Sequence, residues 1–229
     1  KLTAQTLTLA KITGMDYAKA TSNLTAVLNA YNIAAEDAVV VTDSIAAMDT
    51  NAAISSEELM TALTKTASIA ANAGMSLEST EVFLTKMIET TREAPENLGT
   101  ALKTIIARFG EVKQEIDGEE IELADINKVD TALKSIGISL LDTAGQIRNL
   151  DDVFLELSAK WDDLDRNTQR YIATQAAGSR QQSRFIAMMS DYGRTQELVI
   201  AANNSAGGSQ RQFEKTLEGV EAKLEKLKN

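Results

Sequence analysis

Residues Ser55–Ser76 read SSEELMTALTKTASIAANAGMS, and this stretch decides the fold class of the chain. Ser55 and Glu58 form a capping box, in which each side chain accepts a hydrogen bond from a backbone N–H that the first turn of a helix leaves free. Apolar residues then recur every three or four positions, at Leu59, Leu63, Ala67 and Ala70. Gly74 suits the end of this helix, and Ser76 suits the cap of the next one. The stretch therefore predicts two consecutive amphipathic helices joined by a tight turn.

The helical pattern continues on both sides of this stretch. Upstream, Gly14 indicates a break and Asp16 a cap for a helix with apolar positions at Tyr17, Ala20, Leu24, Val27 and Tyr31. Downstream, Pro95 suits the first turn of a helix that carries Leu98, Leu102, Ile105 and Phe109 on one face. Asp165 is expected to cap a later helix. A single proline and an aromatic content of 4% also favour helix over sheet.

The pattern changes after Gly110. The stretch Glu111–Glu120 is polar and contains an Asp-Gly turn signal. A short helix is expected next, on Ile126, Val129, Leu133 and Ile136. The runs Ile138–Leu141 and Gln146–Leu150 then flank a loop that contains glycine, which predicts a small β-hairpin.

The last helix has a narrower apolar stripe than the others. Ser179 with Gln182, and Ser209 with Gln212, are expected to form capping boxes, and Asn203–Ser209 a flexible joint before the last helix. The apolar residues of that helix follow a 4-3-4-3 spacing, at Phe213, Leu217, Val220, Leu224 and Leu227. This is a heptad seam. A helix that lies on its own domain is the alternative, and we favour self-association as a parallel trimer.

Together these signals predict a mainly α fold, a multi-helix bundle with one small β-hairpin and a C-terminal coiled-coil helix. We expect helical hairpins at 1–110, a small α+β insertion at 111–149, a helical subdomain at 150–206 and the start of the coiled-coil helix at 207–229. Neither end resembles a natural terminus, so we interpret the chain as the ordered part of a longer protein.

Composition narrows the function classes. The chain contains no cysteine and no histidine, which excludes disulfides, thiolate metal sites and imidazole-based catalysis. A net charge of −10 opposes binding to nucleic acid, so no direct nucleic-acid recognition is expected. The sequence contains no run of about 18 apolar residues, so no ordinary membrane span is expected. We expect neither an enzyme nor a cofactor.

Three groups of polar residues are candidate binding or catalytic sites, and each also has a simpler structural explanation. Asp162, Asp163 and Asp165 could hold a divalent cation, but helix capping is the favoured interpretation. Asp43 and Asp49 could act as paired carboxylates, but a spacing of six residues places them on different helix faces, and we expect both to be solvated. The arginines could form a patch for an anionic ligand, with solvated helix faces as the favoured alternative; they are Arg166, Arg170, Arg180 and Arg184.

Nearly the whole chain resembles the recurrent region of phage tail tape measure proteins. The strings that carry the resemblance occur in the same order; they include LAKITGMD (Leu9–Asp16), LTAVLNAYNI (Leu24–Ile33), Ser55–Ser76 as quoted above, GTALKTIIARF (Gly99–Phe109), LKSIGISLLDTAGQIRNLDDVFLELSAKW (Leu133–Trp161), AAGSRQQSRFIAMM (Ala176–Met189) and NNSAGGS (Asn203–Ser209). The resemblance implies a long helical protein of the virion. Such a protein is made in the host cytoplasm and lies in the tail lumen or tip, against tube, tip or baseplate proteins. It would set tail length and leave the tube so that DNA can pass.

The sequence fits this role. A helix rises about 1.5 Å per residue and so can act as a ruler. Residues before 203 contain too many caps and glycines for a straight ruler, so we expect a compact head followed by a coiled coil. Two other functions stay open. One is a helical self-associating scaffold or adaptor, and the other is a membrane-active segment that forms a DNA conduit at the host envelope during ejection.

Overall fold

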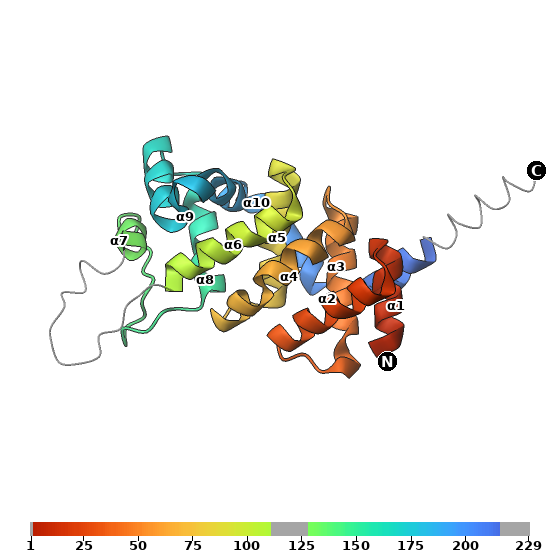
Figure 1. Cartoon of the computed structure of the whole chain (residues 1–229). Coiled ribbons are helices and arrows are strands. Elements are labelled where there is room, and N and C mark those ends of the chain that lie inside the picture. Colours follow the sequence, from red (N-terminus) through yellow and green to blue (C-terminus); the bar gives the residue numbers. More distant parts are fainter. Residues whose placement is uncertain (1, 111–127, 216–229) are drawn as a thin grey trace, which may run out of the picture.

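The structure is a computed structural model that describes residues 2–110 and 128–215. Within these ranges lie ten α-helices, one short 3-10 helix and a helical segment at 208–215. The helices are α1 (Leu2–Thr13), α2 (Tyr17–Ala30), η1 (Ala35–Asp37), α3 (Val39–Asn51), α4 (Ser56–Asn72), α5 (Leu77–Thr91), α6 (Pro95–Gly110), α7 (Lys128–Lys134), α8 (Leu150–Trp161), α9 (Arg166–Met189) and α10 (Tyr192–Asn203). The helices build an elongated molecule, with α7 and α9 at one end and α1 and the 208–215 segment at the other (Figure 1). The expected mainly α class is confirmed.

Local capping explains where several helices begin. The Asp16 carboxylate accepts a hydrogen bond from Lys19 N at 2.8 Å at the start of α2. Both halves of the expected Ser55–Glu58 capping box are present at α4. Ser76 caps α5, and Asp165 caps α9. Because a cap contributes about 1 kcal/mol and fixes the first turn, these four boundaries follow from the sequence alone.

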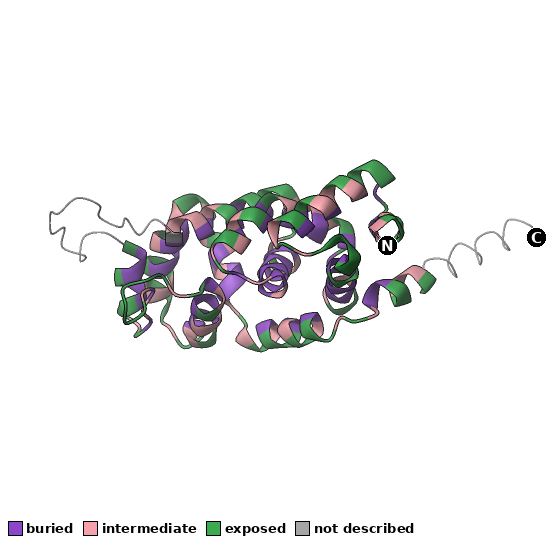
Figure 2. Ribbon diagram, turned by 90° about the horizontal axis from the view of Figure 1, so that it is seen from below, coloured by how far each residue is buried: buried purple, intermediate pink, exposed green. Residues whose placement is uncertain are grey.

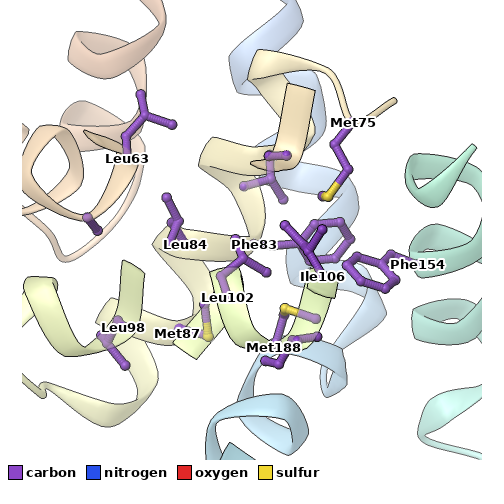
Figure 3. Close-up of a cluster of buried hydrophobic side chains, with 14 of the residues drawn as sticks. Leu63, Met75, Phe83, Leu84, Met87, Leu98, Leu102, Ile106, Phe154 and Met188 are labelled. Carbon is purple, nitrogen blue, oxygen red and sulfur yellow. The ribbon is translucent and has the colours of Figure 1, made fainter. Parts of the chain in front are cut away.

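The core lies where α4, α5 and α6 pack together and α8 and α9 cover them, so that buried faces point inward (Figure 2). The helices α4 and α6 approach closely because Gly99 has no side chain. A Cβ atom there would lie 2.3 Å from the carbonyl oxygen of Ala62. Figure 3 shows Phe83 against Phe154, whose ring centroids are 5.5 Å apart at nearly a right angle. One buried cluster extends along the chain from Leu9 to Ala202.

Two ionisable side chains of α5 are enclosed in this core. Glu81 is fully buried and accepts a hydrogen bond from the Ser44 hydroxyl at 3.0 Å; burial raises the pKa of its carboxyl well above the usual range. Lys86 is 2% exposed, and burial lowers its pKa to about 8. Its Nζ atom donates to Asp191 O at 2.9 Å and Thr195 Oγ1 at 2.7 Å. Lys86 therefore fastens α5 to the turn between α9 and α10.

The expected β-hairpin is wrong. Leu141 and Ile147 form one isolated antiparallel bridge, and α8 begins at Leu150, inside the run expected as the second strand. The carboxylate of Asp130 accepts a hydrogen bond from Leu140 N at 3.1 Å, which ties the first run to α7. A two-stranded hairpin is marginal in water unless further strands or a helix support it. The packing of Ile138–Leu141 against α7 replaces strand pairing.

A break in α9 lies where the sequence places a helix start, but the expected capping box is not formed there. Gly178 has φ 70° and ψ 168°, which bends the helix where a capping box at Ser179 and Gln182 was expected. Gln182 instead donates through Nε2 to the carbonyl oxygen of Arg170 and the hydroxyl of Thr174, each at 3.0 Å. The bend therefore holds the two arms of α9 against each other.

In the part of the chain that the structure describes, no single helix has both the length and the apolar content for a membrane crossing. The pair Tyr17–Ala30 and Ala35–Asn51 has them jointly, with a bend of 117° between its members.

Candidate functional site

The base of the C-terminal helix, which we define as residues 204–212, is docked on α3. The chain turns after α10, with Gly207 at φ 74°, and enters the helical segment 208–215. Asn203–Ser209 was expected to be a flexible joint. Its glycines instead permit a close contact: a Cβ atom on Gly208 would lie 2.8 Å from the carbonyl oxygen of Asp43. Gly208 is therefore required by packing against α3.

Asp43 anchors the start of this helix. Its carboxylate accepts hydrogen bonds from Gly207 N at 2.6 Å, Ser209 N at 3.0 Å and the Ser209 hydroxyl at 2.5 Å. Of these donors, Ser209 N is a first-turn N–H group of the kind that an N-cap side chain normally satisfies. The expectation that Asp43 is solvated is wrong, because its exposed fraction is 6%. A residue more than 160 positions away thus supplies the cap that Ser209 was expected to provide.

Asp49 forms the second anchor. One of its oxygens, Oδ2, accepts hydrogen bonds from Gln212 Nε2 at 2.7 Å and from Ser56 N at 2.8 Å. The Ser56 hydroxyl donates to the same oxygen at 2.7 Å. Asp49 therefore joins the base of the C-terminal helix to the start of α4, and the expectation that it is merely solvated is also wrong.

The sequence contained one signal for this site. Asp43 stands in the largely apolar stretch Val39–Met48 (VVVTDSIAAM), of which Val41–Met48 is buried throughout in the structure. A carboxylate inside such a segment requires hydrogen-bond donors, because burying an unpaired charge is costly. The identity of those donors could not be inferred, since they lie at the far end of the chain.

A groove of about 360 Å³ lies beside the base, between α3, α10 and the segment 208–215. Ile200 of α10 lines it and is 60% exposed. Arg211 and Lys215 line the groove from the C-terminal helix, and Glu197 lines it from α10. The groove therefore combines an exposed apolar side chain with charges of both signs.

The predicted self-association seam starts at this base. Phe213 is half-buried, and Leu217, Val220, Leu224 and Leu227 lie outside the described residues. Self-association and the trimeric state therefore stay predictions.

The acidic cluster serves helix ends. Asp165 accepts from the backbone of α9 and from the Thr168 hydroxyl, and this hydroxyl contact lowers the pKa of the carboxyl. Asp162 accepts from Asp191 N at 3.0 Å and from Tyr192 N at 3.3 Å, at the start of α10. Across residues 2–110 and 128–215, no three His, Cys, Asp or Glu side chains are grouped to hold a metal ion.

The four arginines do not act as one group. Arg184 is bound to Glu93, with its Nε atom 3.1 and 3.0 Å from the two carboxylate oxygens. This pairing lowers the pKa of Glu93. Arg166, Arg170 and Arg180 are exposed.

The family described as phage-related minor tail protein matches residues 1–178, which include α3 with both anchoring carboxylates and end at the bend in α9. No solved structure matches the chain. Because the matched region covers well over half of the 229 residues, the chain belongs to the phage-related minor tail protein family.

Proposed function

We propose that the chain is the head of a tape measure protein and that the helix from residue 208 onward begins the rod that sets tail length. The rod self-associates in parallel as a trimer through Phe213 and the seam residues that follow it. The protein lies in the tail lumen or tip, contacts tube and tip proteins, leaves before DNA passes and catalyses no reaction. Family membership supports the coarser statement that the chain is a structural component of a phage tail.

The observation that carries the proposal is the docked base of the C-terminal helix. Asp43 and Asp49 hold it at two points, at the same end of the molecule as α1 (Figure 1). A helix that leaves a folded body from a fixed base has a defined direction, which a structural rod needs. The groove beside Ile200 adds a surface that a neighbouring copy or a tail protein can contact.

The head and the rod differ in how they contribute to length. A straight helix adds about 1.5 Å for every residue. Residues 2–202 fold back repeatedly, through Gly14 and Gly74 among others, so their number does not translate into length. Only the rod can then act as a ruler.

Tail length tests the proposal. In-frame deletion of 14 residues of the rod, which is two heptads, should shorten the tail by about 21 Å. Negative-stain microscopy of the deletion phage measures the change, and a deletion of half that size serves as an internal control. Complete tails of unchanged length would refute the ruler.

A further inference from the structure

The outer face of α9 is cationic, although the chain as a whole carries a net charge of −10. The helix spans 24 residues and contains Arg166, Arg170, Arg180 and Arg184, with no aspartate or glutamate. Arg184 is neutralised by Glu93. The other three arginines are exposed and have no ion pair within the described residues.

Within α9, the other exposed side chains are polar and uncharged; they are Asn167, Tyr171, Thr174, Ser179 and Ser183. The Thr174 hydroxyl already donates to the Arg170 carbonyl oxygen at 2.7 Å, and the other four can donate a hydrogen bond to a ligand. Tyr171 is 46% exposed and is the one exposed large hydrophobic residue in α9. A protein interface normally needs apolar anchors at its centre, and this face offers little beyond one tyrosine.

The bend at Gly178 makes the face compact. Gln182 lies two residues after Arg180 and donates a hydrogen bond to the carbonyl oxygen of Arg170. This contact brings the two arms of the helix together close to both arginines. Arg108 of α6 extends to the same bend. Its Nη2 atom lies 3.0 Å from the position that a Cβ atom on Gly178 would occupy, and its Nη1 atom donates to Gln175 O at 3.5 Å.

We infer that this face, the α9 arginine surface (Arg166, Arg170, Tyr171 and Arg180), binds the phosphate backbone of duplex DNA without reading its sequence. Phosphate oxygens accept hydrogen bonds and carry negative charge, so a face of donors with arginine forks is complementary to them. Arginine, serine, threonine, asparagine and tyrosine are the side chains that usually contact DNA phosphates. The inference goes beyond a role in setting tail length.

The net negative charge does not oppose this contact at ordinary ionic strength. The Debye length is about 10 Å at 0.1 M salt, so a phosphate at this surface interacts mainly with the charges close to it. Asp165 and Asp162, which precede the helix, each accept backbone hydrogen bonds at a helix start. Asp163 also precedes the helix and is exposed, and Asp165 directly precedes Arg166. Arg170 lies more than one helical turn after Asp165, so Arg170 and Arg180 are assigned the main contacts.

Fluorescence anisotropy with a labelled 30-base-pair duplex and the full chain tests the inference. The variant R166Q/R170Q/R180Q removes three charges, and glutamine keeps the helical propensity. The control K11Q/K19Q/K65Q removes the same charge at exposed lysines of α1, α2 and α4. We expect the arginine variant to lose at least tenfold in affinity at 50 mM salt, and the control less than threefold. The wild-type affinity should fall with salt with a logarithmic slope of about −3.

Circular dichroism of each variant shows whether the fold is retained, and R180Q alone replaces the triple variant if that variant unfolds. Absence of wild-type binding at 50 mM salt would overturn the inference, and so would equal losses in the two triple variants. Competition by polyglutamate at the same charge concentration as DNA would also overturn it, because the surface would then fit an acidic protein.

Discussion

Replacing Asp43 with alanine should release the base of the C-terminal helix and leave the head folded. The substitution removes the acceptor for Gly207 N, Ser209 N and the Ser209 hydroxyl. Asp43 contacts the base through its side chain, whereas the core of the head consists of apolar residues on many helices. We therefore expect a local opening at residues 204–215 and no global unfolding.

The size of the effect follows from burial. Ser209 is 3% exposed, so its N–H and hydroxyl would be left without an acceptor in a site that water reaches poorly. Each unsatisfied buried donor costs about 1–3 kcal/mol, whereas Gly207 is half-buried and can turn to water. The two donors together cost about 2–6 kcal/mol, which corresponds to amide exchange that is about 30 to 20,000 times faster at the base.

Hydrogen exchange followed by mass spectrometry measures this directly. Peptides that cover 204–215 should exchange faster in D43A, and peptides from α4 and α6 should be unchanged. D37A is the matched control, because Asp37 is exposed in η1 and its side chain makes no hydrogen bond in the described part of the chain. Unchanged exchange at the base in D43A would show that the anchor does not hold the helix.

Four further changes test other parts of the molecule. G208A should displace the base, because its new Cβ atom would lie 2.8 Å from a backbone carbonyl; faster exchange at 204–215 is the readout. L217D/L224D should abolish self-association, measured by light scattering, and leave the head folded, measured by circular dichroism. A wild-type chain that stays monomeric at high concentration would refute the seam. Lys86 has a pKa of about 8 in the folded protein and about 10.5 in the unfolded chain. Between these pH values the unfolded chain binds more protons than the folded protein. The free energy of unfolding should therefore rise by about 3 kcal/mol from pH 8 to 10.5. Denaturant unfolding of wild type and K86M measures this, and the rise should be absent from K86M. Deleting Ser55–Gly74 removes α4 from the core, so phage preparations should contain few complete tails in negative stain rather than tails shorter by about 30 Å.

The sequence predicted most of the helices because their signals are local. A serine and a glutamate three residues apart satisfy each other at the start of α4 whatever surrounds them. Leu98, Leu102, Ile105 and Phe109 recur with the helical period and are all buried. Gly74 adopts φ 79° at the predicted turn. Such features need no knowledge of distant residues.

Features that depend on tertiary partners were missed. The runs around Gly145 have strand-like composition, but Asp130 of α7 captures the backbone of Leu140, so one bridge forms and no sheet. Asp43 and Asp49 were expected to be solvated, since the periodicity of α3 does not show what packs on it. Apart from Ser56, which donates to Asp49, their donors lie at positions 207–212, and no local rule connects α3 with that stretch.

The two anchoring carboxylates together constrain both the position and the direction of the C-terminal helix. Asp43 and Asp49 are six residues apart on α3, which corresponds to about 9 Å along the helix axis. They hold Ser209 and Gln212, which lie within one turn of each other. A single contact would set the position of the C-terminal helix and leave its direction free, whereas contacts on two side chains of one rigid helix also constrain its direction. A parallel assembly of such helices would therefore carry its heads at one end, each in the same orientation to the rod, and loss of either anchor should disorder the heads before it separates the rod.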